Sequence, residues 1–189
     1  MTKKGTKNMN IIAGLGNPGI EYQNTRHNAG FLAVDALVKA KGGTWEKSKK
    51  FQAEIAKCGE TLFMKPLSFM NESGRSVQAL LSFYKLLPAK IGFLRTKDAE
   101  LGAVLTVIHD DLDIALGKWK ISTDSRSAGH NGVQSIINKL KTKKFRRIRL
   151  GVMGDKPAAM AGRDYVLQKF KDEELALLKL CIANIDIKN

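Results

Sequence analysis

The sequence predicts an α/β fold: a single domain with a mixed, mostly parallel twisted sheet flanked by helices. Strand-like apolar runs alternate along the chain with segments whose apolar residues recur at helical spacing. The 189 residues, 43% hydrophobic and 26% charged, suit one domain with a substantial core. We expect that domain to span residues 10–189, after a disordered basic tail formed by residues 1–9.

Each strand is predicted from a short apolar or β-branched run. These runs begin at Asn10, flank Gly59 within residues 51–66, and recur at residues 104–110, 117–123 and 145–154. Helices are predicted where apolar residues share one face: Phe31, Val34, Leu37 and Val38; Val77, Leu80, Leu81, Tyr84 and Leu87; Val133, Ile136, Ile137 and Leu140; Leu175, Leu178, Ile182 and Ile185. Pro88 should end the second helix. Residues 87–103 have no period and should form a surface excursion.

Polar residues follow the predicted strands at four separate places. They are Asn17, the run Phe69-Met70-Asn71, the run 109–113, and the run Gly129–Gly132 before a helix. Turns from strand to helix collect at the carboxyl edge of an α/β sheet, where ligands bind. The sequence therefore predicts one polar site at this edge.

Gly14, Gly16 and Gly19 have the G-x-G-x-x-G spacing of a dinucleotide-binding loop. This pattern would favour a nucleotide-dependent oxidoreductase. However, the polar run 22–28 separates the glycines from the first helical pattern, whereas the fingerprint opens a helix within its loop. The acidic residue at the expected distance, Asp35, lies inside a predicted helix. The glycine pattern alone is weak evidence for a cofactor.

The charge and the rare residue types narrow the class of protein. Lys and Arg number 32 against 18 Asp and Glu, and the net charge of +14 favours a polyanionic partner such as nucleic acid, or else serves solubility. Cys58 and Cys181 are isolated, no apolar run could span a bilayer, and no targeting peptide is recognisable, so a cytoplasmic location is expected. The three histidines lack ligand spacing, so neither a metal nor a cofactor is expected.

The polar turns contain the parts of a general-base hydrolase and no good nucleophile. A histidine can take a proton from water, a carboxylate can orient it, and asparagines can donate hydrogen bonds to an oxyanion. Structural roles are also open at this point. Asn71 and Asn131 stand where helix N-caps belong, His27 could be a loop histidine, and Asp111 and Asp113 could be turn residues.

Four motifs resemble those of bacterial peptidyl-tRNA hydrolases: G-L-G-N-P-G-x-x-Y-x-x-T-R-H-N-A-G, K-P-x-x-F-M-N-x-S-G, H-D-D-L-D and G-H-N-G, from about residue 10 to 170. The resemblance implies a monomeric α/β enzyme that cleaves the ester joining a peptide to the 3′ end of tRNA and so recycles peptidyl-tRNA dropped from ribosomes. It implies that His27 is the base, that Asp110 holds it in basic form, and that Asn17 distinguishes blocked from free aminoacyl ends. It also places Tyr22, Phe69, Asn71 and Asn131 against the tRNA or peptide, with Met70 lining the site.

The densest basic run suggests where tRNA phosphates could bind. It follows the helix that Asn131 begins and comprises Lys141, Lys143, Lys144 and Arg146, with Lys139 beside them. The competing interpretation is a solvated surface turn, in which case Lys47, Lys49 and Lys50 are the next candidates.

The main functional alternative is a non-catalytic RNA-binding relative of the same fold. The presence of His27, Asp110 and Asn17 together argues against it, because RNA binding alone requires no base. The chain departs from the family in the length of residues 87–103, in lacking a proline after H-D-D-L-D, and in the short stretch after its last helix.

Overall fold

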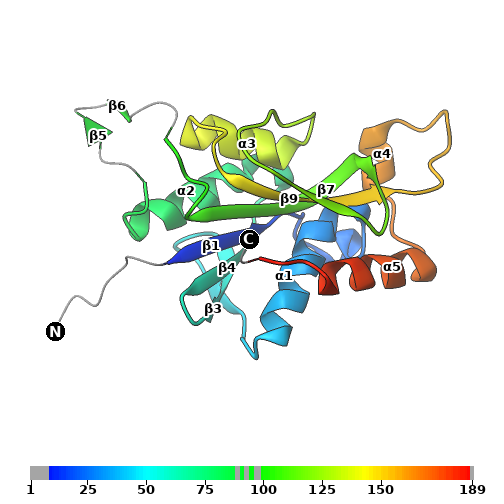
Figure 1. Cartoon of the computed structure of the whole chain (residues 1–189), viewed down its shortest axis with the longest axis horizontal. Helices are drawn as coiled ribbons and strands as arrows, with labels where there is room; N and C mark the ends of the chain where they lie inside the picture. Colours follow the sequence, from blue (N-terminus) through cyan, green and yellow to red (C-terminus); the bar gives the residue numbers. More distant parts are fainter. Residues whose placement is uncertain (1–8, 88–89, 92–93, 96–98, 188–189) are drawn as a thin grey trace.

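The computed structural model describes residues 9–87, 90–91, 94–95 and 99–187. Except for residue 9, the expected N-terminal tail lies outside the described residues, as does part of the expected excursion. A twisted sheet has helices on both faces (Figure 1), with α2 and α3 on one face and α1 and α5 on the other. The predicted α/β class is therefore confirmed.

The sheet has seven strands in the order β2-β3-β4-β1-β7-β9-β8. Their bounds are β1 Asn10–Gly14, β2 Glu46–Ser48, β3 Ala53–Cys58, β4 Thr61–Pro66, β7 Leu105–Ala115, β8 Trp119–Ser122 and β9 Arg146–Met153. The four central strands, β4, β1, β7 and β9, are parallel, and the outer pairs are antiparallel. The mixed sheet is as predicted, but parallel pairing is confined to its centre. Two short strands, β5 (Lys90–Ile91) and β6 (Leu94–Arg95), pair separately within the excursion.

The helices are α1 Ala29–Ala40, α2 Ser73–Phe83, α3 Asn131–Leu140, α4 Gly162–Val166 and α5 Asp172–Ala183. Three 3-10 turns, η1 Ile20–Tyr22, η2 Arg26–Asn28 and η3 Met70–Glu72, carry polar side chains. The sequence prediction for α2 was wrong at its end, because the chain leaves the helix at Tyr84 and Lys85 takes a left-handed conformation with φ of 56°. The short helix α4 has no apolar period and was not predicted.

Two cores on opposite faces of the sheet hold the layers together. Adjacent residues of β1 point to opposite faces, so Ile11 packs with α2 and α3 while Ile12 packs with α1 and α5. Both are almost fully buried, as is usual for a strand covered on both faces. The central strands are thereby fixed, and the polar turns at their carboxyl ends stand on a rigid base.

Gly14, the last residue of β1, and Gly16 allow close packing against α1. A side chain at Gly14 would collide with the carbonyl oxygen of Gly30 and with Val34, so glycine lets α1 lie directly against the end of β1. Only Gly19 of the three has a positive φ, 118°, which other residues rarely adopt. Two 3-10 turns separate these glycines from α1, whereas the dinucleotide fingerprint opens its helix within the glycine loop.

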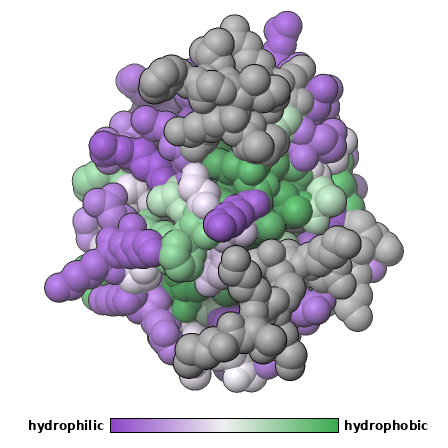
Figure 2. All heavy atoms as spheres, turned by 90° about the vertical axis from the view of Figure 1, so that its left-hand side faces the viewer, coloured by the Kyte–Doolittle hydropathy of each residue, from purple (hydrophilic) through white to green (hydrophobic). Residues whose placement is uncertain are grey.

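The end of the molecule at which the central strands begin is shown in Figure 2. Hydrophobic side chains gather in the middle of this face, with hydrophilic ones around them. Partly buried residues that border the α2–α3 core precede β1 and β7 or follow α2, and include Met9, Leu86, Leu87 and Val104. In the part of the chain that the structure describes, no helix combines the length and the apolar character needed to span a membrane.

Candidate active site

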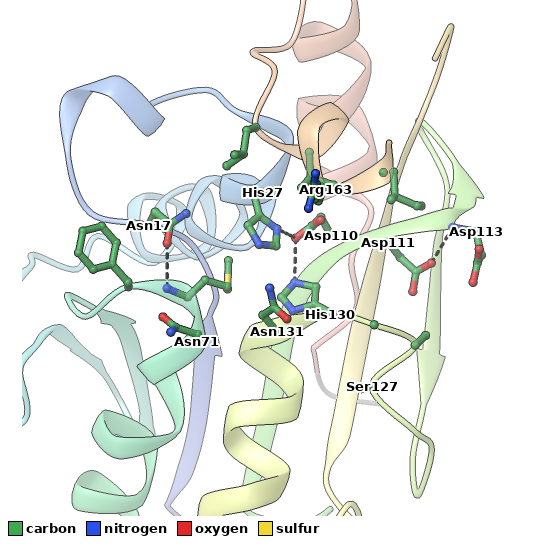
Figure 3. Close-up of a pocket in the computed structure, with 18 residues that line it drawn as sticks. Asn17, His27, Asn71, Asp110, Asp111, Asp113, Ser127, His130, Asn131 and Arg163 are labelled. Atoms are coloured by element: carbon green, nitrogen blue, oxygen red, sulfur yellow. Dashed lines mark hydrogen bonds and ion pairs between the residues drawn. The ribbon is translucent and has the colours of Figure 1, made fainter. Parts of the chain in front are cut away.

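A cleft of about 650 Å³ lies at the carboxyl edge of the central strands. Its walls come from the turn after β1, from η2 and η3, from the end of β7, from the start of α3 and from α4 (Figure 3). The cleft brings together most of the residues that the sequence singled out: Asn17, His27, Phe69, Met70, Asn71, Asp110 and Asn131. The separate polar turns therefore line one cleft at this edge, as the order of the strands predicted.

His27 is joined to Asp110 by a short contact. Its Nδ1 atom lies 2.9 Å from Oδ1 of Asp110. A carboxylate can only accept a hydrogen bond, so Nδ1 carries the proton and donates it, which leaves a lone pair on Nε2. That second nitrogen faces the part of the cleft beside Asn17 (Figure 3). The arrangement leaves a base open to a molecule in the cleft.

His130 binds the same carboxylate oxygen and was missed as a site residue by the sequence analysis. Its Nε2 lies 2.9 Å from Oδ1 of Asp110. Its Nδ1 accepts hydrogen bonds from the backbone N–H groups of Gly132 and Val133, at 3.1 and 3.3 Å, so the proton must lie on Nε2. His130 is the N-cap of α3. The signal in the sequence was the position of His130 directly before a predicted helix, where N-cap residues stand.

The two asparagines considered as helix caps do not cap. Asn131 is the first residue of α3, and its side chain lies at the cleft (Figure 3). Asn71 lies inside η3 and is exposed at the cleft, while Glu72 precedes α2 without a side-chain cap. Both carboxamides are therefore available to a bound molecule.

The surroundings of Asp110 favour its charge and strengthen the base. Burial alone would raise the pKa of Asp110, but the adjacent imidazoles of His130 and His27 outweigh burial and hold that pKa well below its ordinary range. Burial alone would lower the pKa of His27, but the charge and hydrogen bond of Asp110 prevail and raise it above 6.5. The carboxylate is thus ionised at neutral pH and strengthens His27 as a base.

His109, the third histidine of the chain, lies behind this group. Its Nδ1 donates to the carbonyl oxygen of Asp110 at 2.7 Å, and its ring lies 4.7 Å from that of His130. Full burial, followed by the proximity of His130, lowers the pKa of His109 to about 3. His109 is therefore a neutral packing partner of the cluster.

His27, Asp110 and His130 also place their ligand atoms within 4.8 Å of one another, which raises the question of a metal. A histidine that binds a metal normally donates its other N–H to an acceptor. The other nitrogen of His130 instead accepts from two backbone N–H groups, so Nε2 must keep its proton. The ligand atoms of His27, Asp110 and His130 therefore suit shared protons better than a metal ion.

Asn17 is held in one orientation by three hydrogen bonds. Its backbone N–H donates to Oδ1 of Asn28 at 2.8 Å, and its carbonyl accepts from Nδ2 of Asn28 at 3.0 Å. Its Oδ1 accepts from the backbone N–H of Met70 at 2.8 Å. The Nδ2 group of Asn17, with two donors and no acceptor, is left to serve the cleft. Asn28 was not singled out from the sequence because its role is to bind a backbone.

Arg26 ties the turn that carries His27 to the C-terminal part of the chain. One guanidinium nitrogen lies 2.6 and 2.7 Å from the two carboxylate oxygens of Glu174. Another donates to the carbonyl of Lys169 at 2.8 Å, and the group stacks on Tyr165 with its central carbon 4.3 Å from the ring centroid. The arginine is almost fully buried. It therefore fixes η2 against α4 and α5.

Asp111 and Asp113 were considered as turn residues or solvated charges. Asp111 accepts from the backbone N–H of Asp113 at 2.9 Å, as an aspartate in a turn does. Its other oxygen lies 2.7 Å from Nε of Arg149, which links the end of β7 to β9. Asp111 is thus a buried structural residue at the wall of the cleft.

Other predicted residues do not line this cleft. Tyr22 lies in η1, and its carbonyl oxygen accepts from the hydroxyl of Thr25 at 2.8 Å. Lys141, Lys143 and Lys144 follow the C-terminal end of α3, away from the cleft where α3 begins. Arg146 is the first residue of β9, and its guanidinium donates to the carbonyls of Asp186 and Ile187 at 3.2 and 2.9 Å. It belongs to the opposite edge of the sheet.

The fold and the cleft together define a class: a single-domain α/β protein with the parts of a general-base hydrolase at the carboxyl edge of its sheet. Sequence comparison agrees with this class. The family model for peptidyl-tRNA hydrolase matches residues 11–187. The chain belongs to the peptidyl-tRNA hydrolase family.

Individual relatives match over most of their length. A peptidyl-tRNA hydrolase from Mycoplasma capricolum subsp. capricolum is 42% identical over 175 residues, which cover 90% of this chain and 86% of that protein. One from Gloeobacter violaceus is 36% identical over 186 residues, covering 94% and 86%. The crystal structure of peptidyl-tRNA hydrolase from Acinetobacter baumannii has a TM-score of 0.79 at 30% identity, covering 95% of this chain and 86% of that one.

Proposed function

We propose that this protein hydrolyses the ester between a peptide and the 3′ end of tRNA, with His27 as the general base. The observation that carries the proposal is the pair of His27 and buried Asp110, whose second imidazole nitrogen faces an open cleft. Binding of RNA alone would not require an oriented base with a raised pKa. Family membership supplies the substrate class.

The reaction follows from these positions. Nε2 of His27 takes a proton from water, and the water oxygen attacks the ester carbonyl carbon. The carboxamide N–H groups of Asn71 and Asn131, both at the cleft, stabilise the negative charge on the carbonyl oxygen. The bond from that carbon to the ribose 3′ oxygen then breaks. The imidazolium returns its proton to the leaving oxygen, which yields tRNA and a free peptide.

Asn17 supports selection of blocked aminoacyl ends. Its oxygen is used by Met70, so only its two N–H donors serve the cleft. The carbonyl of a peptide bond or an N-acyl group accepts such a donor. The α-ammonium group of an aminoacyl-tRNA that carries no peptide is itself a donor and offers no acceptor at this place.

The net charge of +14 suits a tRNA partner. We propose that the acceptor stem lies along the basic surface that follows α3, with Lys141, Lys143 and Lys144 as phosphate contacts. The commitment of Arg146 to two backbone carbonyls removes it from this set. The enzyme acts as a monomer in the cytoplasm, without a metal or cofactor.

The test is hydrolysis of N-acetylaminoacyl-tRNA by the parent protein and by His27→Ala. Turnover should fall by about 10²–10⁴-fold, the usual contribution of a general base, while tRNA binding persists. Circular dichroism should show the same fold. A well-folded His27→Ala protein with normal turnover would disprove the role of the base. A parent protein that binds tRNA without cleaving it would favour the non-catalytic alternative.

A further inference from the structure

A second groove begins where the cleft ends. It has a volume of about 510 Å³ and is formed by the 17–20 loop, by Gln23 and Asn24 beyond η1, by one side of α1, and by β2, β3 and β4. Asn17 lines both cavities, and no other residue of the described chain is common to the two. In Figure 3 Asn17 lies on the far side of His27 from Asp110. The groove therefore continues the cleft past Asn17.

We propose that this groove binds the peptide part of the substrate, upstream of the residue esterified to tRNA. The proposal rests on the proposed function and adds a second binding region to it. A peptidyl ester placed over His27 has two arms, one nucleotide and one peptide. The two cavities that meet at Asn17 provide one region for each.

The polar groups on the two sides of His27 assign the arms. On the other side of His27 from Asn17, α4 places Arg163 at the cleft; its side chain is 87% exposed, lies 3.6 Å from Asp164 and can meet a phosphate. On the opposite side, the donor group of Asn17 suits a peptide carbonyl. A chain whose carbonyl binds Asn17 runs next past Pro18 and Ile20, which line the groove.

The interior of the groove is polar but balanced in charge. Nζ of Lys65 lies 2.7 Å from Asp35 and 2.9 Å from Glu54, and Lys47 also lines the groove, so its two lysines balance its two carboxylates. Gln23 and Asn24 add carboxamides, which can donate to and accept from a peptide backbone of any sequence. A groove whose charges balance favours neither acidic nor basic peptides. This suits a substrate whose peptide sequence varies.

Ile20 gives the groove an apolar rim. Its side chain is 82% exposed, the largest exposure among the large hydrophobic residues that the structure describes. It belongs to η1, which packs at the mouth of the groove and takes no part in the hydrogen bonds of His27 or Asn17. An upstream peptide residue would cover Ile20, and this gives the proposal a measurable contact.

The experiment compares two substrates on the same tRNA with the same esterified amino acid: N-acetylaminoacyl-tRNA and N-acetyltetrapeptidyl-tRNA. The parent should show a KM about three- to tenfold lower for the longer substrate, as expected for partial burial of an aliphatic side chain and a few polar contacts. Ile20→Asp should abolish this advantage and leave KM and kcat for the short substrate unchanged. The matched control is Leu180→Asp, which places the same charge at an exposed leucine of α5, 65% exposed and outside the groove.

The outcomes separate this proposal from the function on which it rests. Equal KM values for both substrates in the parent would overturn the peptide groove, as would an equal rise for both in Ile20→Asp. Loss of the length advantage in Leu180→Asp would also overturn it, because the effect would then be one of charge alone. Absence of hydrolysis of either substrate by the parent would contradict the proposed function itself.

Discussion

Nε2 of His130 lies 2.9 Å from Oδ1 of Asp110 and donates its proton to that oxygen. The same oxygen receives Nδ1 of His27, also at 2.9 Å, so two imidazoles share one acceptor. Because His130 is held in its tautomer by the first N–H groups of α3, the start of that helix is connected through Asp110 to the proposed base. The strength of the base should therefore respond to changes at either partner.

Asp110→Asn should lower the pKa of His27, because the carboxylate is what raises it in the folded protein. His27 acts as a base only when unprotonated, so the acidic limb of the kcat/KM profile should move to lower pH. Turnover at the plateau should fall by up to about 10⁴-fold, because the imidazole loses its orienting charge. A pH–rate profile with the parent's acidic limb would contradict the pairing.

His130→Asn should move the acidic limb in the opposite direction. Without the proton from His130, Asp110 interacts with His27 alone and should raise the pKa of His27 further. Asparagine is a good N-cap but too short to reach Asp110, so α3 should keep its stability. The control is His130→Ala, which should shift the limb equally and also lose about 0.5–2 kcal/mol of unfolding free energy. An acidic limb that stays in place in both variants would show that His130 only caps the helix.

His109 should make the protein sensitive to acid. Its pKa falls from 6.5 to about 3 on folding, so between these values the unfolded chain binds the additional proton and stability drops as pH falls. The slope from this group is up to about 1.4 kcal/mol per pH unit. His27, with its raised pKa, acts oppositely: its stabilisation is complete below 6.5 and is lost as pH rises through the folded value.

The check on His109 is urea unfolding of the parent and of His109→Asn from pH 4 to 6.5. Asparagine can keep a donor near the carbonyl of Asp110 but does not titrate. The variant should therefore lose less stability than the parent as pH falls. Parallel curves for the two proteins would mean that other groups cause the acid sensitivity.

Replacement of Lys141, Lys143 and Lys144 by alanine should raise KM for tRNA substrates and reduce their salt dependence. Removal of one lysine–phosphate pair should lower the log–log slope by about 0.7–0.9. The helix α3 has ten residues, so its C-terminal end lies about 15 Å from the cleft, a distance suited to the stem behind a bound 3′ end. The matched control replaces the exposed Lys39, Lys57 and Lys179 on other elements. An unchanged slope in the first triple variant would place the RNA elsewhere.

The sequence predicted those parts of the site that are set by the order of strands. Asn17 and Asn71 follow parallel strands, and Asp110 lies in β7 beyond the last residue that pairs with β1, so sheet geometry brings the three to one edge. The alternation of apolar runs likewise predicted the layers. Apolar spacing does not determine where a helix ends. The helix α2 ends earlier than predicted because Lys85 takes a left-handed conformation, which the spacing does not indicate.

Contacts between segments far apart in sequence could not be predicted in this way. His130 reaches Asp110 because its other nitrogen caps α3, and no spacing rule identifies the direction of that ring. Arg146 looked like a phosphate contact within a basic run, but it binds carbonyls close to residue 187. Its role depends on where the last residues return to the sheet.

The pair formed by Arg26 and Glu174 has a consequence for the order in which the protein folds during its synthesis. The two residues lie 148 positions apart, so the turn that carries His27 is synthesised long before the helix that anchors it. A growing chain can form β1 and α1 early, yet the guanidinium of Arg26 has no carboxylate partner until Glu174 has left the ribosomal tunnel. The turn that carries His27 thus reaches its final structure late in biosynthesis, only when the C-terminal helix is free to dock.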